Sequence, residues 1–120
     1  MLVLESGKKI HAEEIESVLA TSTDLKEFCV LGSRQFDPSK PEQVVAVVVP
    51  TAEYIEKHEK EWSKVADHME SELQNLCSRS LSAFKRPSRI FVLKDDLPKT
   101  SSMKVKTKVL GQQILESIRS

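Results

Sequence analysis

The sequence has 120 residues and a mass of 13.5 kDa, which is enough for one domain of ordinary size and excludes a large multidomain enzyme within it. Hydrophobic residues make up 39% and charged residues 30%, a balance that can close a hydrophobic core and that argues against intrinsic disorder. The 18 Lys and Arg residues cancel the 18 Asp and Glu residues, so no overall charge attracts the chain to nucleic acid or to an anionic membrane.

The first third of the chain predicts a hairpin, a helix and a strand. Residues 1–4 form a short apolar run that Ser6 and Gly7 interrupt, and extended structure could resume at Lys9 and Ile10, a pattern typical of a tight hairpin with its pivot at the glycine. Residues 12–21 place apolar side chains at helical spacing and begin with several Glu residues, which favours a helix. Residues 25–31 become apolar towards their end and suit a strand.

The rest of the chain predicts two more strands and two helical regions. The valine-rich run at 44–49 indicates a strand covered on both faces. Residues 51–76 carry an apolar stripe that fits one long helix or two abutting helices, with Thr51 as a possible N-cap. A short strand at 90–93 and a final helix at 109–118 follow. We therefore expect an α+β fold, with a small mixed β-sheet, an N-terminal β-hairpin and about three helices packed on the sheet.

The cysteines and histidines do not form a recognisable reactive site or metal site in the sequence. Cys29 lies in a strand-like run and Cys77 on a helical stripe, without CxxC spacing, so we expect two buried thiols. His11, His58 and His68 are far apart and lack ligand partners at metal spacing, so we expect no metal. Since the sequence also has no signal-like start and no apolar run of membrane-spanning length, we expect a cytoplasmic protein without a transmembrane segment.

Four stretches, in the same order, resemble the C-terminal domain of the acyl-adenylate-forming enzymes, the superfamily of acyl-coenzyme A synthetases, luciferases and peptide-synthetase adenylation domains. Residues 93–110, LKDDLPKTSSMKVKTKVL, resemble the lysine motif LPKTxSGK and the helix after it. Residues 6–16, SGKKIHAEEIE, resemble the hairpin-and-helix motif GxxIxPxEIE. Residues 29–42 resemble the strand, glycine and loop segment, and residues 81–90, LSAFKRPSRI, resemble LAxYKxPxxI. Together the stretches are spread over residues 6–110, nearly the whole length of the chain.

Two positions depart from the family pattern. Met103 stands where the lysine motif usually has glycine, and Ala12 replaces the proline of the hairpin motif. If the family's glycine has a positive φ, methionine costs about 1 kcal/mol of strain and could slow adenylation. The matching residues are Leu97, Pro98, Lys99, Thr100, Ser102 and Lys104 in the first motif and Gly7, Ile10, Glu14, Ile15 and Glu16 in the second.

The resemblance implies that residues 1–120 are a single mobile lid domain without the large N-terminal domain that binds ATP. The hinge residue and the arginine that precede the hairpin in the family are missing, so we expect Met1 to be either a truncation boundary within a longer enzyme or a start that follows a deletion. That enzyme would be an ATP-dependent acid-CoA ligase, fatty-acyl-CoA synthetase-like, and the isolated domain would be inactive. ATP and coenzyme A would be its cofactors, with Mg²⁺ in the N-terminal domain and none bound by this domain alone. The expected partners are that N-terminal adenylation domain and a carboxylic acid, with a fatty acid as the first expectation.

The resemblance gives catalytic meaning to Lys104. When a carboxylate attacks the α-phosphate of ATP, negative charge accumulates on phosphoryl oxygens, and a lysine ammonium can stabilise that charge. By residue type alone, Lys99, Lys104, Lys106 and Lys108 would be a solvated basic segment, and we expect the other three to remain mostly solvated.

In the family, the lid then rotates and turns the hairpin towards the coenzyme A thiol. Gly7 and Lys8 are therefore candidate residues on the coenzyme A side. Because glycine has no side chain, its backbone can approach a narrow ligand channel, although Gly7 could equally serve only to make the turn. Glu14 and Glu16 are expected to be charges at a helix start rather than catalytic carboxylates.

Two alternatives remain. Residues 85–108 hold eight basic residues against two acidic ones, a local net charge of +6, which is compatible with a module that binds nucleic acid or another anion. Few aromatic side chains accompany this patch, and residues 53–72 carry seven acids against three bases, so we do not expect nucleic acid as a partner. The other alternative is a non-catalytic interaction domain with the same fold, supported by the substituted glycine and the missing hinge.

Overall fold

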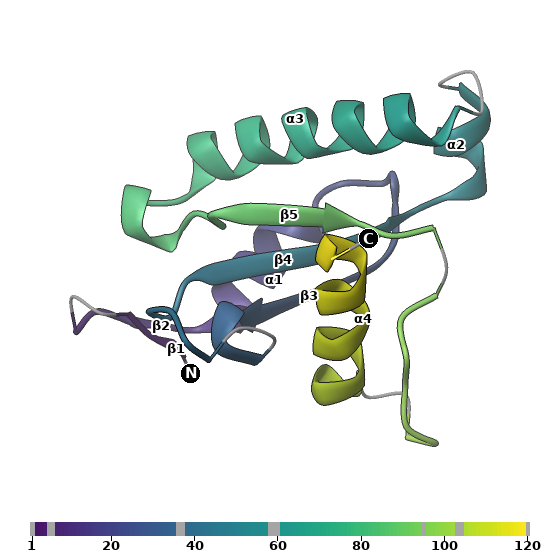
Figure 1. The fold of residues 1–120 in the computed structure, drawn as a ribbon. Helices are drawn as coiled ribbons and strands as arrows, with labels where there is room; N and C mark the ends of the chain where they lie inside the picture. Colours follow the sequence, from purple (N-terminus) through teal and green to yellow (C-terminus); the bar gives the residue numbers. More distant parts are fainter. Residues whose placement is uncertain are drawn as a thin grey trace.

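The structure is a computed structural model and describes residues 2–4, 7–35, 38–57, 61–94, 96–102 and 105–119. Residues 51–76, for which one or two helices were predicted, contain two. The expected α+β fold with an N-terminal hairpin is confirmed (Figure 1). In chain order its elements are β1 (Leu2–Val3), β2 (Lys9–Ile10), α1 (Ala12–Leu19), β3 (Leu25–Gly32), β4 (Val44–Pro50), α2 (Ala52–Lys57), α3 (Trp62–Ser80), β5 (Arg89–Val92) and α4 (Thr107–Arg119), with short 3₁₀ turns at Ser33–Gln35 and Ala83–Lys85.

The main sheet is mixed, with β4 in the centre, antiparallel to β3 and parallel to β5. In the middle of the sheet, Val47 pairs with Cys29 on one side and with Phe91 on the other. The strands β1 and β2 form a separate antiparallel ribbon, in which Leu2 pairs with Ile10. Ile10 is fully buried, so the ribbon is attached to the body of the domain by its second strand.

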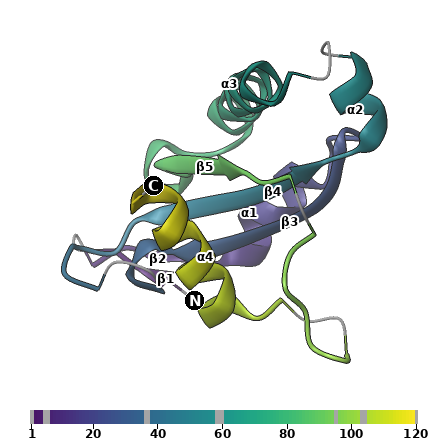
Figure 2. The ribbon, with the colours of Figure 1, turned by 45° about the vertical axis from the view of Figure 1, so that its right-hand side comes forward.

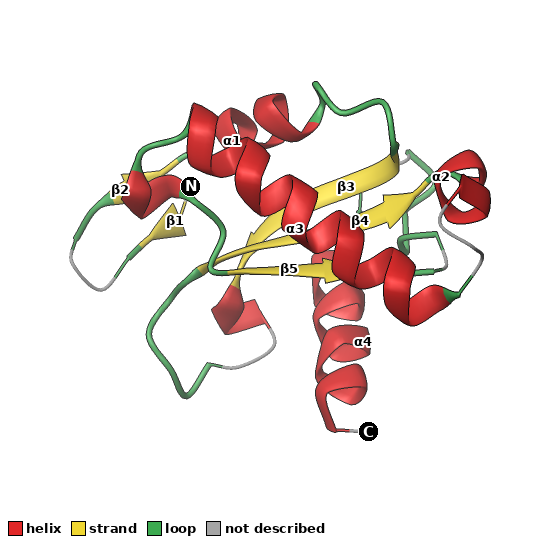
Figure 3. Cartoon of the chain, turned by 90° about the horizontal axis from the view of Figure 1, so that it is seen from above, coloured by secondary structure: helices red, strands yellow, loops and turns green. Residues whose placement is uncertain are grey.

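Successive β4 side chains alternate between two hydrophobic cores, as the two-residue period of a strand requires. Val44, Ala46 and Val48 pack with buried residues of α1 and α3, and we call this cluster the α1/α3 core. Val45, Val47 and Val49 pack with Leu110 and Ile114 of α4, and we call this cluster the α4 core. Figures 2 and 3 show α1 and α3 on one face of the sheet and α4 on the other. The prediction that this strand is covered on both faces is confirmed.

The helices bury apolar stripes at the predicted spacing. In α3 the buried side chains recur every four residues, at Val65, Met69, Leu73 and Cys77. The predicted cap of α2 is also present, because the Thr51 Oγ1 accepts the Tyr54 N–H at 3.2 Å. None of the described helices has a stretch long and apolar enough to cross a bilayer.

Both cysteines are buried free thiols, as predicted. Cys77 belongs to the α1/α3 core and Cys29 to the α4 core. Burial raises the pKa of the Cys29 thiol to about 11, with a smaller contribution from the negative charge of Glu16. Burial also raises the pKa of the Cys77 thiol. Both thiols are therefore protonated, and so weakly nucleophilic, at neutral pH.

Candidate functional site

The chain between β5 and α4 folds back on itself, and we call residues 97–102 and 105–106 the lysine hairpin. Lys99 and Val105 form an antiparallel bridge across it. The Lys106 N–H donates to the Pro98 carbonyl at 2.8 Å, and the Leu110 N–H donates to the Lys106 carbonyl at 3.0 Å. The two ends of the hairpin are thus joined to each other, and its second end continues directly into α4.

Apolar packing attaches both ends of the lysine hairpin to the α4 core. Leu97 is only 4% exposed and belongs to this core, together with Leu110 of α4. Val105, on the opposite side of the bridge, is partly buried against the same cluster. The hairpin is therefore seated on the sheet through the face that α4 covers.

Glu27 of β3 binds the first end of the lysine hairpin through both carboxylate oxygens. Its Oε2 accepts the Leu97 N–H at 2.8 Å, and its Oε1 forms an ion pair with the Lys99 ammonium. The Glu27 and Lys99 side chains are 11% and 25% exposed, so this pair is largely shielded from water. Beside it, Lys26 and Asp96 form a second ion pair at 2.7 Å, with both side chains more than half exposed. The start of β3 thereby connects to the hairpin at Leu97 and Lys99 and to the residue just before it, Asp96.

Sequence reasoning did not single out Glu27. The available signal was an acidic side chain between Lys26 and Phe28 inside a strand whose following residues are apolar. Its partner Leu97 lies 70 residues further along the chain, and no local pattern connects the two positions.

The three described lysines of the segment lie in different environments. Lys104, the predicted catalytic lysine, and Met103 lie outside the described residues. Lys106 and Lys108 are exposed, as expected. The expectation that Lys99 is solvated was wrong, because its ammonium pairs with a mostly buried carboxylate. Lys99 is therefore a structural residue of the hairpin.

The β1–β2 ribbon turns where the sequence predicted. Gly7 has a φ of +85°, and its N–H donates to the Leu4 carbonyl at 2.8 Å. The Leu4 N–H in turn donates to the Lys8 carbonyl at 2.9 Å. A Cβ placed on Gly7 would meet no atom within 4 Å, so glycine is required by the backbone conformation and not by a lack of space. Gly7 and Lys8 are both exposed.

Glu14 and Glu16, the two glutamates of the hairpin motif, both lie near other parts of the domain. Glu14 forms an ion pair with Lys85 at 2.7 Å, which connects α1 to the turn Ala83–Lys85. Burial raises the pKa of Glu16, and a hydrogen bond from the Val30 backbone partly opposes that rise. Both glutamates therefore interact with other parts of the domain.

The two candidate regions do not meet in space. In Figures 1 and 2 the β1–β2 ribbon extends from one end of the domain, and the segment that joins β5 to α4 extends from the other end. Gly7 and Lys8 therefore belong to one surface and the lysine hairpin to another.

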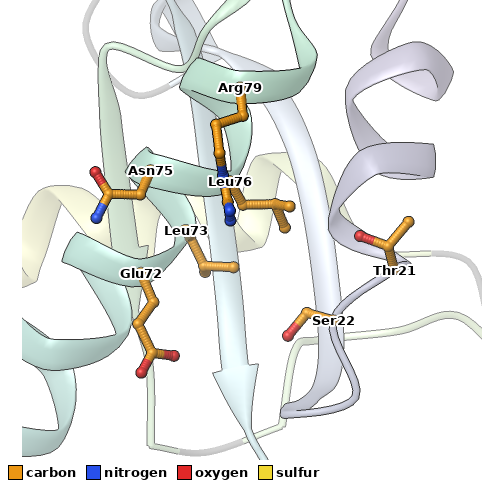
Figure 4. A pocket seen from close by; sticks show the side chains of 7 residues that line it. All are labelled: Thr21, Ser22, Glu72, Leu73, Asn75, Leu76 and Arg79. Atoms are coloured by element: carbon orange, nitrogen blue, oxygen red, sulfur yellow. The ribbon is translucent and has the colours of Figure 1, made fainter.

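An open pocket of about 340 Å³ lies between α3 and the turn after α1 (Figure 4). Its lining mixes acidic, basic, hydroxyl, amide and apolar side chains: Thr21, Ser22, Glu72, Leu73, Asn75, Leu76 and Arg79. Glu72 also contacts His68 at 2.8 Å. Within the described ranges, no group of three or more His, Cys, Asp or Glu side chains could hold a metal ion. The pocket lies on the α1/α3 side of the sheet, away from the lysine hairpin.

Several basic residues of the +6 segment are engaged within the domain. Lys85 and Lys99 pair with Glu14 and Glu27, so two buried or half-exposed acids offset part of the local charge. Arg86 donates to the Ser78 and Leu81 carbonyls at 3.0 and 3.2 Å. These contacts weaken the alternative of a basic surface that binds nucleic acid.

Comparison with known proteins gives a consistent result. The model of the family described as AMP-binding enzyme C-terminal domain matches residues 14–104. The chain is 41% identical over 108 residues to a probable CoA ligase, CCL8, of Humulus lupulus. That match covers 90% of this chain and 17% of the ligase. It is 32% identical over 116 residues to the 4-chlorobenzoate-CoA ligase of Pseudomonas sp. strain CBS-3. That match covers 94% of this chain and 19% of the ligase.

The same relation appears among solved structures. The fold superimposes on ATP-bound MatB from Rhodopseudomonas palustris with a TM-score of 0.71 at 24% identity, covering 98% of this chain and 20% of that chain. This likeness shows the fold. The chain spans about a fifth of the length of the curated relatives it matches.

Proposed function

Because the chain belongs to the family of AMP-binding enzyme C-terminal domains, we propose that it is the catalytic lid of an AMP-forming acid-CoA ligase. Its partner in this proposal is an N-terminal adenylation domain, and ATP, a carboxylic acid and coenzyme A are the reactants. The observation that supports the proposal most directly is the lysine hairpin. Its two ends are joined by the Lys99–Val105 bridge and seated on the α4 core, in the part of the chain that contains Lys104.

In the proposed adenylation step, Lys104 supplies positive charge to the reacting phosphate. The acid's carboxylate oxygen attacks the α-phosphorus of ATP, and pyrophosphate leaves. Both reactants are anions, and charge accumulates on the phosphoryl oxygens in the transition state. An ammonium group placed there binds the transition state more strongly than the ground state, which is the condition for raising the rate. Mg²⁺ and the triphosphate would be held by the N-terminal domain.

In the proposed thioester step, the β1–β2 ribbon faces the coenzyme A side. The surface position of Gly7, and the open space around it, leave its backbone accessible to a ligand chain. Lys8 follows it on the same exposed turn and offers an ammonium to the phosphate groups of coenzyme A. For the acid we propose a fatty acid, and for the enzyme a cytoplasmic location, as the sequence suggested.

The proposal can be tested in a chimera. The 116-residue region of the Pseudomonas 4-chlorobenzoate-CoA ligase that matches this chain is replaced by residues 1–120. Adenylation is followed as exchange of labelled pyrophosphate into ATP that depends on 4-chlorobenzoate. Thioester formation is followed separately, from prepared 4-chlorobenzoyl-adenylate and coenzyme A. The isolated chain should support neither reaction.

Lys104→Ala should lower pyrophosphate exchange by about 100-fold or more, the usual size for loss of one electrostatic catalytic group. Thioester formation from the supplied adenylate should change far less. Lys108→Ala is the matched control, because Lys108 is an exposed lysine of the same segment and should leave both reactions unchanged. A chimera as inactive as the truncated ligase, or equal losses in both steps for Lys104→Ala, would contradict the proposed function.

A further inference from the structure

We propose that Glu27 is a positioning residue for adenylation. It holds the lysine hairpin against β3, in the position from which Lys104 would reach the reacting phosphate. This inference rests on the proposed function of Lys104. Glu27 does not touch the reactants in this proposal. It acts through Leu97 and Lys99, the two residues of the hairpin that its carboxylate binds.

The shielding of Glu27 makes its two contacts necessary. A carboxylate that is 11% exposed has lost most of its water, so its charge must be balanced by donors within the protein. The Leu97 N–H and the Lys99 ammonium occupy one oxygen each. Movement of the hairpin away from β3 would therefore separate a shielded charge from both of its partners.

These contacts lie at the first end of the hairpin, on both sides of Pro98. Pro98 has no N–H, so it joins the hairpin only through its carbonyl, which accepts the Lys106 N–H. The residues on either side of Pro98 are the two that Glu27 binds. One side chain of β3 thus adds two polar contacts to the apolar packing of Leu97 at the first end of the hairpin, and the Lys99–Val105 bridge connects that end to the residue that follows Lys104.

The ion pair with Glu27 also distinguishes Lys99 from Lys104. With its charge balanced by Glu27, Lys99 does not compete with Lys104 for the anionic centre. Loss of the Glu27 charge would release an ammonium five positions before Lys104 and would weaken the hydrogen bond from the Leu97 N–H, because a neutral oxygen is a weaker acceptor than a carboxylate. Both effects act on adenylation and leave the β1–β2 ribbon, at the other end of the domain, unchanged (Figure 1).

The neighbouring pair provides a matched control. Lys26 and Asp96 connect the same strand to the same segment at 2.7 Å, but both side chains are more than half exposed. Exposed pairs of this kind contribute little, because water screens them. Asp96→Asn therefore removes one charge next to the hairpin without removing a shielded contact.

The test uses Glu27→Gln and Asp96→Asn in the chimera described above. The glutamine keeps an oxygen for the Leu97 N–H and loses the ion pair with Lys99. We expect Glu27→Gln to lower kcat for pyrophosphate exchange by about 10- to 100-fold, the size expected when a catalytic group is displaced by about 1 Å. Thioester formation from supplied adenylate should stay within about twofold of the unsubstituted chimera. Asp96→Asn should leave both reactions unchanged.

A second variant separates positioning from general loss of stability. In Glu27→Gln combined with Lys99→Gln, the unpaired ammonium is absent, and a neutral amide pair can form in its place. We expect this variant to recover part of the lost exchange. Equal losses in adenylation and thioester formation for Glu27→Gln, or an effect no larger than that of Asp96→Asn, would overturn the inference. If Lys104→Ala retains full pyrophosphate exchange, the proposed function is wrong. If Lys104→Ala loses pyrophosphate exchange and Glu27→Gln does not, only the proposed role of Glu27 is wrong.

Discussion

Truncation of Leu97 tests whether the lysine hairpin is seated on the sheet as described. Leu97 is 4% exposed and packs in the α4 core, so Leu97→Ala removes buried methyl groups and leaves a cavity. Leucine-to-alanine changes at such sites cost about 2–5 kcal/mol, and we take about 3 kcal/mol as the expected loss. This is a substantial part of the roughly 5–15 kcal/mol that stabilises a typical domain, yet it leaves most molecules folded.

The measurement is urea unfolding of the chain, followed by far-ultraviolet circular dichroism. With an m-value of about 2 kcal/mol/M, a loss of about 3 kcal/mol lowers the unfolding midpoint by about 1.5 M. Leu73→Ala is the matched control, because Leu73 is 3% exposed but lies in the α1/α3 core, on the other face of the sheet. The two variants should lose similar stability. In the chimera, under conditions where both are folded, only Leu97→Ala should depress pyrophosphate exchange.

Two results would refute this reasoning. A loss below about 1 kcal/mol for Leu97→Ala would mean that the side chain is not buried in the α4 core, since an exposed leucine costs little to truncate. Equal pyrophosphate exchange in Leu97→Ala and Leu73→Ala would mean that adenylation does not depend on how the hairpin is seated.

Two further predictions concern the turn at Gly7 and the buried thiols. Gly7→Ala should destabilise the chain by about 1 kcal/mol through backbone strain alone, and Gly7→Asn by less; an unchanged urea midpoint for Gly7→Ala would contradict the positive φ. Burial raises the pKa of Cys29 to about 11 from its ordinary value of 9.0 and also raises that of Cys77, so the unfolded chain ionises first and stability should fall as pH rises from about 9 to 11. Cys29→Ala combined with Cys77→Ala should flatten that fall in urea unfolding at a series of pH values, and an identical slope would exclude the thiols as its cause.

The parts of the fold that could be predicted are those governed by local periodicity. The six apolar residues at 44–49 predicted a strand buried on both faces, because no polar side chain marks a solvent face. The four-residue spacing of the α3 stripe similarly predicted a buried helical face. In α2, Tyr54 is buried in the α1/α3 core, and Ile55 beside it is partly buried against the same core. A helix of six residues is too short for its periodicity to fix its rotation.

The attachment of the lysine hairpin could not be predicted, because it depends on contacts between distant parts of the chain. A lysine after Leu-Pro in a charged segment is usually solvated, and only the fold places Glu27 beside Lys99. By contrast, Gly7 was predictable, because a glycine that interrupts extended structure directly after a short apolar run is a local signal for a turn. Periodicity thus determined the layers, whereas the site depends on which strand end lies next to which loop.

The separation of the two candidate surfaces bears on how one domain could serve two reactions. The domain measures 42 by 31 by 31 Å, and the β1–β2 ribbon and the lysine hairpin lie at opposite ends of it (Figure 1). No side chain spans such a distance, and β4, buried on both faces between them, offers no hinge inside the sheet. If both surfaces act on one acyl group, as proposed, the domain must turn as a unit between the two half-reactions. Variants that loosen the lysine hairpin should then impair adenylation only, because the ribbon reaches the acyl group after Lys104 has left it.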